Sequence, residues 1–142
     1  MQEAELRVPS TLEAVAQATQ QLRALLPDWL SGSEADAIEL AIAEALTNIV
    51  QHGHAGQPGH EIRLRVRERD AAVEIDLWDQ GRPIPRERLR NADASTTFQF
   101  DPTDLAGLPE GGMGLALIKA AFHEVRYGSR DGVNRLHLVR RM

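Results

Sequence analysis

The chain of 142 residues contains no cysteine, no long apolar run and no excess of basic residues. Without cysteine it can form neither a disulfide framework nor a metal site with thiolate ligands. No apolar run approaches the roughly 20 residues of a membrane-spanning helix, and we expect no membrane span. The formal charge of −5, from 21 acidic and 16 basic residues, argues against binding nucleic acid by neutralising its phosphates.

The length of the chain is that of one ordinary domain with its own hydrophobic core. The first residues, MQEAELRVPS, lack the basic start and apolar stretch of a secretory signal. The chain shows no internal repeat and no low-complexity tract. We therefore expect residues 1–142 to form a single domain of a cytoplasmic protein.

Two amphipathic helices are predicted in the first half of the chain. Ser10 and Glu13 have the spacing of a capping box and predict the start of the first helix. The second is expected from about 34 to 52, with Ile38 and Ile42 on its apolar face.

Apolar and polar residues alternate in several short segments, which is the pattern of strands with one buried face. Such segments lie near residues 6–8, 62–66, 73–79, 125–127 and 136–138. A short third helix is expected just before the last two strands. The sequence therefore predicts an α+β fold, a two-layer α/β sandwich with helices on one face of a mixed, mainly antiparallel sheet.

The outward positions of the central hairpin are charged. Arg63 and Arg65 lie on one strand, and Glu74 and Asp76 lie on the next. Because opposite charges face each other across the hairpin, we interpret this surface as a solvated ion-pair face rather than a nucleic-acid site.

The second helix carries polar residues at a spacing of four. Residues four apart lie nearly above one another, with a drift of about 40° per step, so Glu44, Asn48 and His52 form one stripe beside the apolar face. A carboxylate near a core is costly unless it is paired or used. The alternative, that these are ordinary exposed helix residues, stays open on spacing alone.

Asp79 continues the inward parity of the strand that contains Ile75 and Leu77, so it carries a carboxylate to the buried side. A buried carboxylate needs hydrogen-bond donors, and the amino group of a purine is one. Gly81 allows either an unusual backbone angle or close approach of a ligand. The alternative is that a twist or bulge turns Asp79 to solvent.

The segment Gly112-Met113-Gly114-Leu115 precedes an apolar helix. Glycines at that place let backbone N–H groups converge on a phosphate at the helix N-terminus. The motif is not a Walker sequence, because no Gly-Lys-Ser/Thr follows, and a plain loop is the alternative. Residues 82–111 show little periodicity, which is typical of a functional lid or of disorder.

Three segments, IAEALTNIVQHG, DLWDQGRPIP and EGGMGLALIKAAFHEVRY, resemble the ATPase superfamily of gyrase, histidine kinases and MutL. Within it, the chain is most similar to the anti-sigma factor serine/threonine kinases of the RsbW and SpoIIAB type. The resemblance spans nearly the whole chain and implies the histidine-kinase-like ATPase fold. One departure is that Arg82-Pro83 stands where a second glycine is often found, which stiffens this loop.

The resemblance implies a role for each motif. Glu44 would be the general base, and Asn48 would bind Mg²⁺ as well as the nucleotide. Asp79 would bind the amino group of adenine, with Gly81 allowing the base to approach. The residues Gly112, Met113, Gly114 and Leu115 would wrap the phosphates of ATP or ADP, and residues from about 86 to 110 would form the ATP lid. The role of His52 stays open.

The function that the resemblance implies is that of an ATP-dependent serine/threonine protein kinase and anti-sigma factor in a partner-switching system. It would phosphorylate a STAS-domain anti-sigma factor antagonist, sequester a sigma factor and form a homodimer. One alternative is a nucleotide-binding module that sequesters a partner without phosphotransfer. A second is a stand-alone ATPase domain of the histidine-kinase type.

Overall fold

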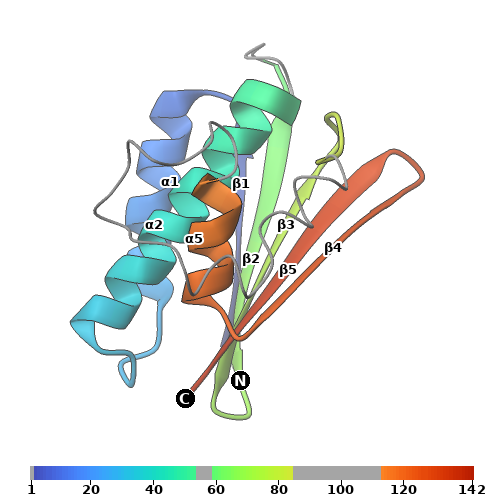
Figure 1. Cartoon of the computed structure of the whole chain (residues 1–142). Coiled ribbons are helices and arrows are strands. Elements are labelled where there is room, and N and C mark those ends of the chain that lie inside the picture. Colours follow the sequence, from blue (N-terminus) through green and yellow to red (C-terminus); the bar gives the residue numbers. More distant parts are fainter. Residues whose placement is uncertain (1, 54–58, 85–112) are drawn as a thin grey trace.

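The computed structural model of the chain describes residues 2–53, 59–84 and 113–142. Its elements follow the order strand, two helices, two strands, helix, two strands (Figure 1). The bounds are β1 (Gln2–Pro9), α1 (Leu12–Leu25), α2 (Gly32–Asn48), a π-helical turn (Ile49–Gly53), β2 (Glu61–Arg69), β3 (Ala72–Asp79), α5 (Met113–Ala121), β4 (Glu124–Arg130) and β5 (Val133–Arg141).

The described strands form one five-stranded sheet in the order β1-β2-β3-β5-β4. Every neighbouring pair is antiparallel. The sheet of the described strands is therefore antiparallel throughout, where the prediction was of a mixed, mainly antiparallel sheet. The three helices lie together on one face of the sheet (Figure 1). The predicted two-layer α+β sandwich is confirmed.

The core lies between the sheet and α2, as strand parity predicts. The inward residues of β2 and β3 are fully or almost fully buried: Ile62, Leu64, Val66, Val73, Ile75 and Leu77. Ile38, Ile42 and Leu46 of α2 are completely buried against them. Burying one side chain of this size contributes about 1.5–3 kcal/mol, so this apolar layer fixes α2 on the sheet.

Two predicted helix boundaries were wrong. The N-cap of α1 is Thr11, whose Oγ1 accepts a hydrogen bond from the Ala14 N–H at 3.1 Å. Ser10 is buried and instead exchanges hydrogen bonds with the backbone of His60, which extends the pairing of β1 with β2. At the other boundary, α2 ends at Asn48 and the chain continues as a π-helical turn.

Both hairpins have two-residue turns with positive φ at each residue. Asp70 and Ala71 join β2 to β3 with φ of 53° and 59°, and Asp131 and Gly132 join β4 to β5 with φ of 54° and 79°. Turns of this kind match the twist of the flanking strands. Ala71 is the unusual residue, because an alanine is strained in the left-handed region.

Candidate functional site

Glu44 and Asn48 lie one turn apart near the end of α2, and both side chains are partly buried. The other acidic side chains of α2 form ion pairs: Glu34 with Arg140, and Asp36 and Glu39 with Arg23. In the part of the chain that the structure describes, neither Glu44 nor Asn48 has a side-chain hydrogen bond or an ion pair.

The predicted stripe of Glu44, Asn48 and His52 does not extend to His52, because the α-helix ends at Asn48. His52 lies in the π-helical turn and is exposed. A π turn closes its hydrogen bonds at i→i+5, so it displaces the residues after Asn48 from α-helical register. The same displacement buries Val50, whereas an unbroken helix would place Ile49 on the apolar face.

Asp79 ends β3 and points inward, as its parity predicts, with 6% of its surface exposed. Its Oδ1 accepts hydrogen bonds from the Gly81 N–H at 2.8 Å and from the Asn134 amide at 2.9 Å. No donor among the described residues contacts its Oδ2. The buried carboxylate therefore has one oxygen held by the protein and one that can accept a hydrogen bond from a ligand.

The chain beyond Asp79 is held by β4 and β5. The Asn134 amide also donates to the Gly81 carbonyl oxygen at 2.8 Å, and the Tyr127 hydroxyl accepts from the Ile84 N–H at 2.8 Å. Burial raises the pKa of Tyr127, with a smaller contribution from the charge of Asp79, so its hydroxyl stays neutral at physiological pH. Neither Asn134 nor Tyr127 was predicted from the sequence as part of this site.

The glycine segment is described only in part. Met113 begins α5, and Gly114 and Leu115 lie in its first turn. Gly112 and the predicted lid at 86–110 lie outside the described residues. α5 packs against α2. The N-terminus of α5, the C-terminal end of α2 and the end of β3 all lie toward one end of the sandwich, at the top of Figure 1. The predicted motifs are thus collected at one end of the fold.

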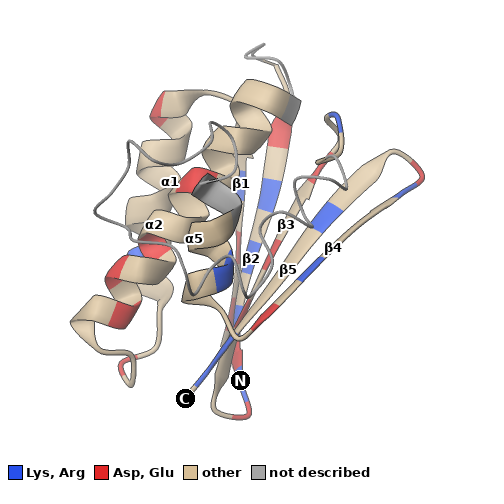
Figure 2. Ribbon diagram, in the orientation of Figure 1, with Lys and Arg blue, Asp and Glu red and all other residues tan. Residues whose placement is uncertain are grey.

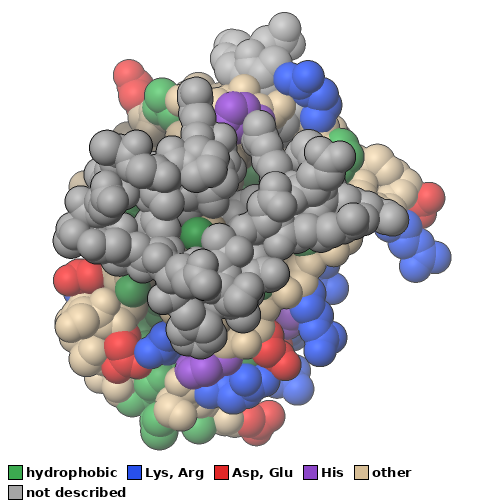
Figure 3. All heavy atoms as spheres, in the orientation of Figure 1, with side chains coloured by type: hydrophobic (Ala, Val, Ile, Leu, Met, Phe, Trp, Pro, Cys, Tyr) green, Lys and Arg blue, Asp and Glu red, His purple; other side chains and the backbone are tan. Residues whose placement is uncertain are grey.

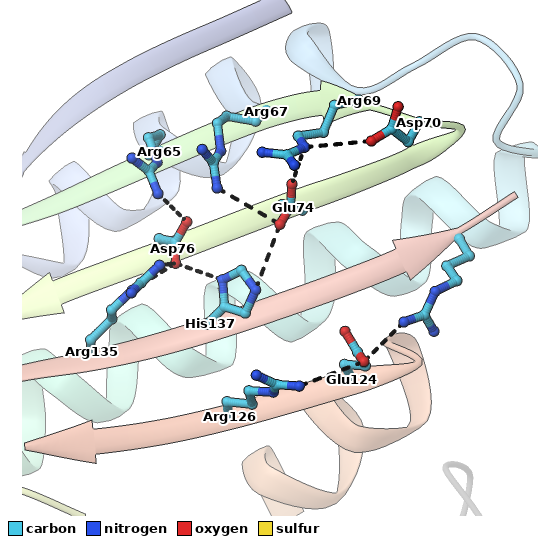
Figure 4. A network of polar contacts seen from close by, with 11 residues as sticks. Arg65, Arg67, Arg69, Asp70, Glu74, Asp76, Glu124, Arg126, Arg135 and His137 are labelled. Atoms are coloured by element: carbon cyan, nitrogen blue, oxygen red, sulfur yellow. Dashed lines mark hydrogen bonds and ion pairs between the residues drawn. The ribbon is translucent and has the colours of Figure 1, made fainter. Parts of the chain in front are cut away.

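A second polar cluster lies on the opposite face of the sheet (Figure 4). Asp76 is completely buried there, although its outward position predicts a solvated residue. It is bound by Arg65 at 2.9 Å, by Arg135 at 2.8 Å and by His137 at 2.7 Å. The ring of Trp78 lies 4.9 and 5.5 Å from the guanidinium carbons of Arg65 and Arg135. The ion pairs are confirmed, but the solvation of Asp76 was wrong because arginines and Trp78 cover it.

The charge of Asp76 is maintained by these contacts. Burial raises the pKa of its carboxyl, but the bonds from His137, Arg65 and Arg135 outweigh burial and hold the pKa below its usual range. Both of its oxygens are occupied, Oδ1 by His137 and Arg135 and Oδ2 by Arg65. Both oxygens of Asp76 are therefore bonded to side chains of the sheet, and the carboxylate is completely buried.

Charges of both signs are spread over the described elements (Figure 2). On the face shown in Figure 3, basic side chains lie beside acidic ones. A cavity of about 620 Å³ lies at the turn between β2 and β3 and is lined by Gln2, Glu68, Arg69, Asp70 and Ala71. None of these is a predicted site residue.

Two further observations concern metals and membranes. Within residues 2–53, 59–84 and 113–142, no group of three or more His, Cys, Asp or Glu side chains is arranged to hold a metal ion. No helix in the same ranges is long and apolar enough to span a bilayer. The side-chain amide of Asn48, which has no partner among the described residues, has an oxygen that fits Mg²⁺. This ion keeps several waters and is usually bound by one or two protein oxygens together with phosphate oxygens of the substrate.

The chain is similar to several known kinases. Serine-protein kinase RsbW from Oceanobacillus iheyensis is 28% identical over 131 residues, which cover 91% of this chain and 80% of that protein. RsbW from Bacillus subtilis is 28% identical over 70% of this chain and 61% of its own length. Serine/threonine-protein kinase BtrW from Bordetella bronchiseptica is 33% identical over 72% of this chain and 67% of its own length.

The fold is also similar to solved structures. The crystal structure of the RsbU and RsbW domains of Rv1364c from Mycobacterium tuberculosis matches 99% of this chain with a TM-score of 0.67 and 21% identity, over 32% of that chain. The mycobacterial sensor histidine kinase MprB matches 98% of this chain with a TM-score of 0.51 and 17% identity, over its full length. Residues 8–140 match the family described as histidine kinase-like ATPase domain. RsbW kinases are among the relatives to which the chain is similar, and the chain belongs to the histidine kinase-like ATPase family.

Proposed function

We propose that the protein is an ATP-dependent serine/threonine protein kinase and anti-sigma factor of a partner-switching system. The observation that carries this proposal is the state of three polar side chains. Glu44, Asn48 and Asp79 are partly or largely buried, yet each keeps a group without a partner among the described residues, while the neighbouring acids of α2 are ion-paired. Polar groups left open in this way are typical of a site that a ligand completes.

ATP would bind at the end of the sandwich where the motifs meet. Asp79 would accept a hydrogen bond from the amino group of adenine, and Gly81 would let the base approach. The segment Gly112-Met113-Gly114-Leu115 would contact the phosphates through its backbone, with residues 86–110 as the lid. Asn48 would hold Mg²⁺, which supplies neutralisation of phosphate charge when it is bound.

Glu44 would act on the acceptor hydroxyl of the protein substrate. Its carboxylate would orient the hydroxyl and take its proton as the hydroxyl oxygen bonds to the γ-phosphorus and ADP leaves. A carboxylate held in an ion pair would be a poor base for this step. Glu44 is the acid of α2 for which the described residues provide no cation, which favours it over Glu34 and Glu39.

The substrate would be a serine or threonine of a STAS-domain anti-sigma factor antagonist, and the sequestered partner would be a sigma factor. Support comes from the RsbW and BtrW relatives, which are named as serine and serine/threonine protein kinases. Nucleotide state and phosphorylation would decide which partner is bound. We further propose a single cytoplasmic domain of residues 1–142 that forms a homodimer.

Phosphotransfer with Glu44→Gln tests the proposal. The protein is incubated with labelled ATP, Mg²⁺ and a candidate STAS-domain partner, and acid-stable label on the partner is counted. We expect Glu44→Gln to lower transfer by about 100-fold or more, as the loss of a general base does, while ATP affinity changes little. Glu39→Gln is the matched control, because it neutralises an ion-paired acid of the same helix.

The alternatives give different results. If the parent protein binds ATP but labels no cognate partner, it is a sequestration module without phosphotransfer. Acid-labile label would indicate a phosphohistidine and a domain of the histidine-kinase type. Equal transfer by Glu44→Gln and the parent would show that another group is the base.

A further inference from the structure

Asn134 is buried beside Asp79, with 1% of its surface exposed, and its amide nitrogen faces two acceptors. One is Oδ1 of Asp79 at 2.9 Å, and the other is the carbonyl oxygen of Gly81 at 2.8 Å. An amide group carries two N–H donors, so both neighbours are satisfied by this one nitrogen. The opposite orientation would set the amide oxygen against two other oxygens, which excludes it.

We infer that Asn134 is the positioning residue that makes the site select purines with an amino group at position 6. The inference rests on the proposed binding of the base by Asp79. With Oδ1 held by the Asn134 amide and the Gly81 N–H, the carboxylate cannot turn. Its Oδ2 then offers a fixed acceptor, which suits the 6-amino group of adenine and repels a 6-oxo group.

The same amide couples the carboxylate to the backbone that follows it. Because Asn134 binds the Gly81 carbonyl as well as Asp79, one side chain of β5 sets both the acceptor and the loop beside it. Tyr127 of β4 holds the same loop three residues later, at the Ile84 N–H, without touching the carboxylate. The two strands therefore have different roles. Asn134 of β5 contacts both the carboxylate and the loop, whereas Tyr127 of β4 contacts the loop alone.

The test compares the affinities for ATP and for inosine triphosphate, which carries an oxo group at position 6, by isothermal titration calorimetry. The parent should prefer ATP by about 10- to 100-fold, the factor that a hydrogen bond to a charged group contributes. Asn134→Ala should reduce this preference at least about fivefold, because the carboxylate can rotate and hydrate. Asn134→Thr, which keeps one donor, should retain more of the preference.

Asn134→Asp is a second and more stringent variant. Two carboxyl groups at hydrogen-bond distance share a proton, so Asp79 would lose much of its negative charge in this variant. The variant should therefore lose most of the parent's preference for ATP over inosine triphosphate. Tyr127→Phe is the matched control. It should weaken both nucleotides by a similar factor and leave their ratio unchanged. Far-ultraviolet circular dichroism and melting curves identify the variants that are folded.

The possible failures are distinguishable. If the parent binds neither nucleotide, or binds both equally, the proposed reading of the base by Asp79 fails. If the parent prefers ATP and the folded Asn134 variants keep the same ratio, the role of Asn134 is overturned while the proposed function stands. A change of the ratio in Tyr127→Phe as large as in Asn134→Ala would also overturn it, since general loosening of the loop would then suffice.

Discussion

Replacing Asp76 by asparagine should destabilise the protein strongly, although the residue lies on the sheet face that the helices leave uncovered. The carboxylate is completely buried and receives charged or polar donors from Arg65, Arg135 and His137. Removing one partner of a buried ion pair costs about 3–5 kcal/mol. Here the side chain of Arg135 is 48% exposed and can regain hydration, so we expect a loss of about 2–3 kcal/mol.

The loss is measured by urea denaturation at pH 7 and by thermal melting. For a chain of this size, a loss of about 2–3 kcal/mol lowers the melting temperature by about 4–12 °C. Glu5→Gln is the matched control. It also removes an acid paired with an arginine on this face, Arg63, but its side chain is 41% exposed, so we expect a much smaller loss than for Asp76→Asn.

The pH dependence tests the cause. The folded pKa of Asp76 lies below its usual range, so its contribution to stability is present above the unfolded value of about 4 and is lost as the pH falls through the folded value. The difference between the parent and Asp76→Asn should therefore be present at about pH 6 and shrink below about pH 4. A loss no larger than that of Glu5→Gln, or one that stays the same at about pH 3, would refute the reasoning.

Two further substitutions test other parts of the fold. Ala71→Gly should stabilise the protein by about 0.5–1 kcal/mol, because Ala71 has φ of 59° and glycine removes that strain. Gly132→Ala in the equivalent turn should destabilise the protein. A lower urea midpoint for Ala71→Gly would contradict this reasoning. Arg140→Met should cost about 1–2 kcal/mol, because Arg140 joins Glu34 of α2 to the Ala121 carbonyl at the end of α5. Its control is Arg141→Met, which removes a more exposed ion pair and should change the free energy of unfolding by less than about 0.5 kcal/mol.

The fold could be predicted because its signals are local and periodic. Alternation along β2 and β3 identified the buried face, and the same parity carried Asp79 inward at the end of β3. Helical spacing likewise placed Glu44 and Asn48 on one side of α2, where the structure leaves both without a described partner. These inferences needed only the neighbours of each residue within its own element.

The errors arose where distant parts of the chain decide the outcome. Ser10 has the character of an N-cap, but it is used to extend the β1–β2 pairing, and Thr11 takes its place. The π-helical turn after Asn48 has no periodic signal that a helix pattern would reveal. Asn134 lies 55 residues from Asp79 in the sequence and becomes its neighbour only because β5 pairs with β3 in this register.

Asp76 and Asp79 show how the neighbouring strands assign different tasks to the same residue type. They are three residues apart on β3, so their side chains lie on opposite faces of the sheet. β2 and β5 supply Arg65, Arg135 and His137 to Asp76, and both of its oxygens are occupied. On the other face β5 supplies Asn134, which holds only one oxygen of Asp79. Burial alone therefore does not distinguish the two carboxylates. The difference lies in Oδ2, which is bonded in Asp76 and has no donor among the described residues in Asp79.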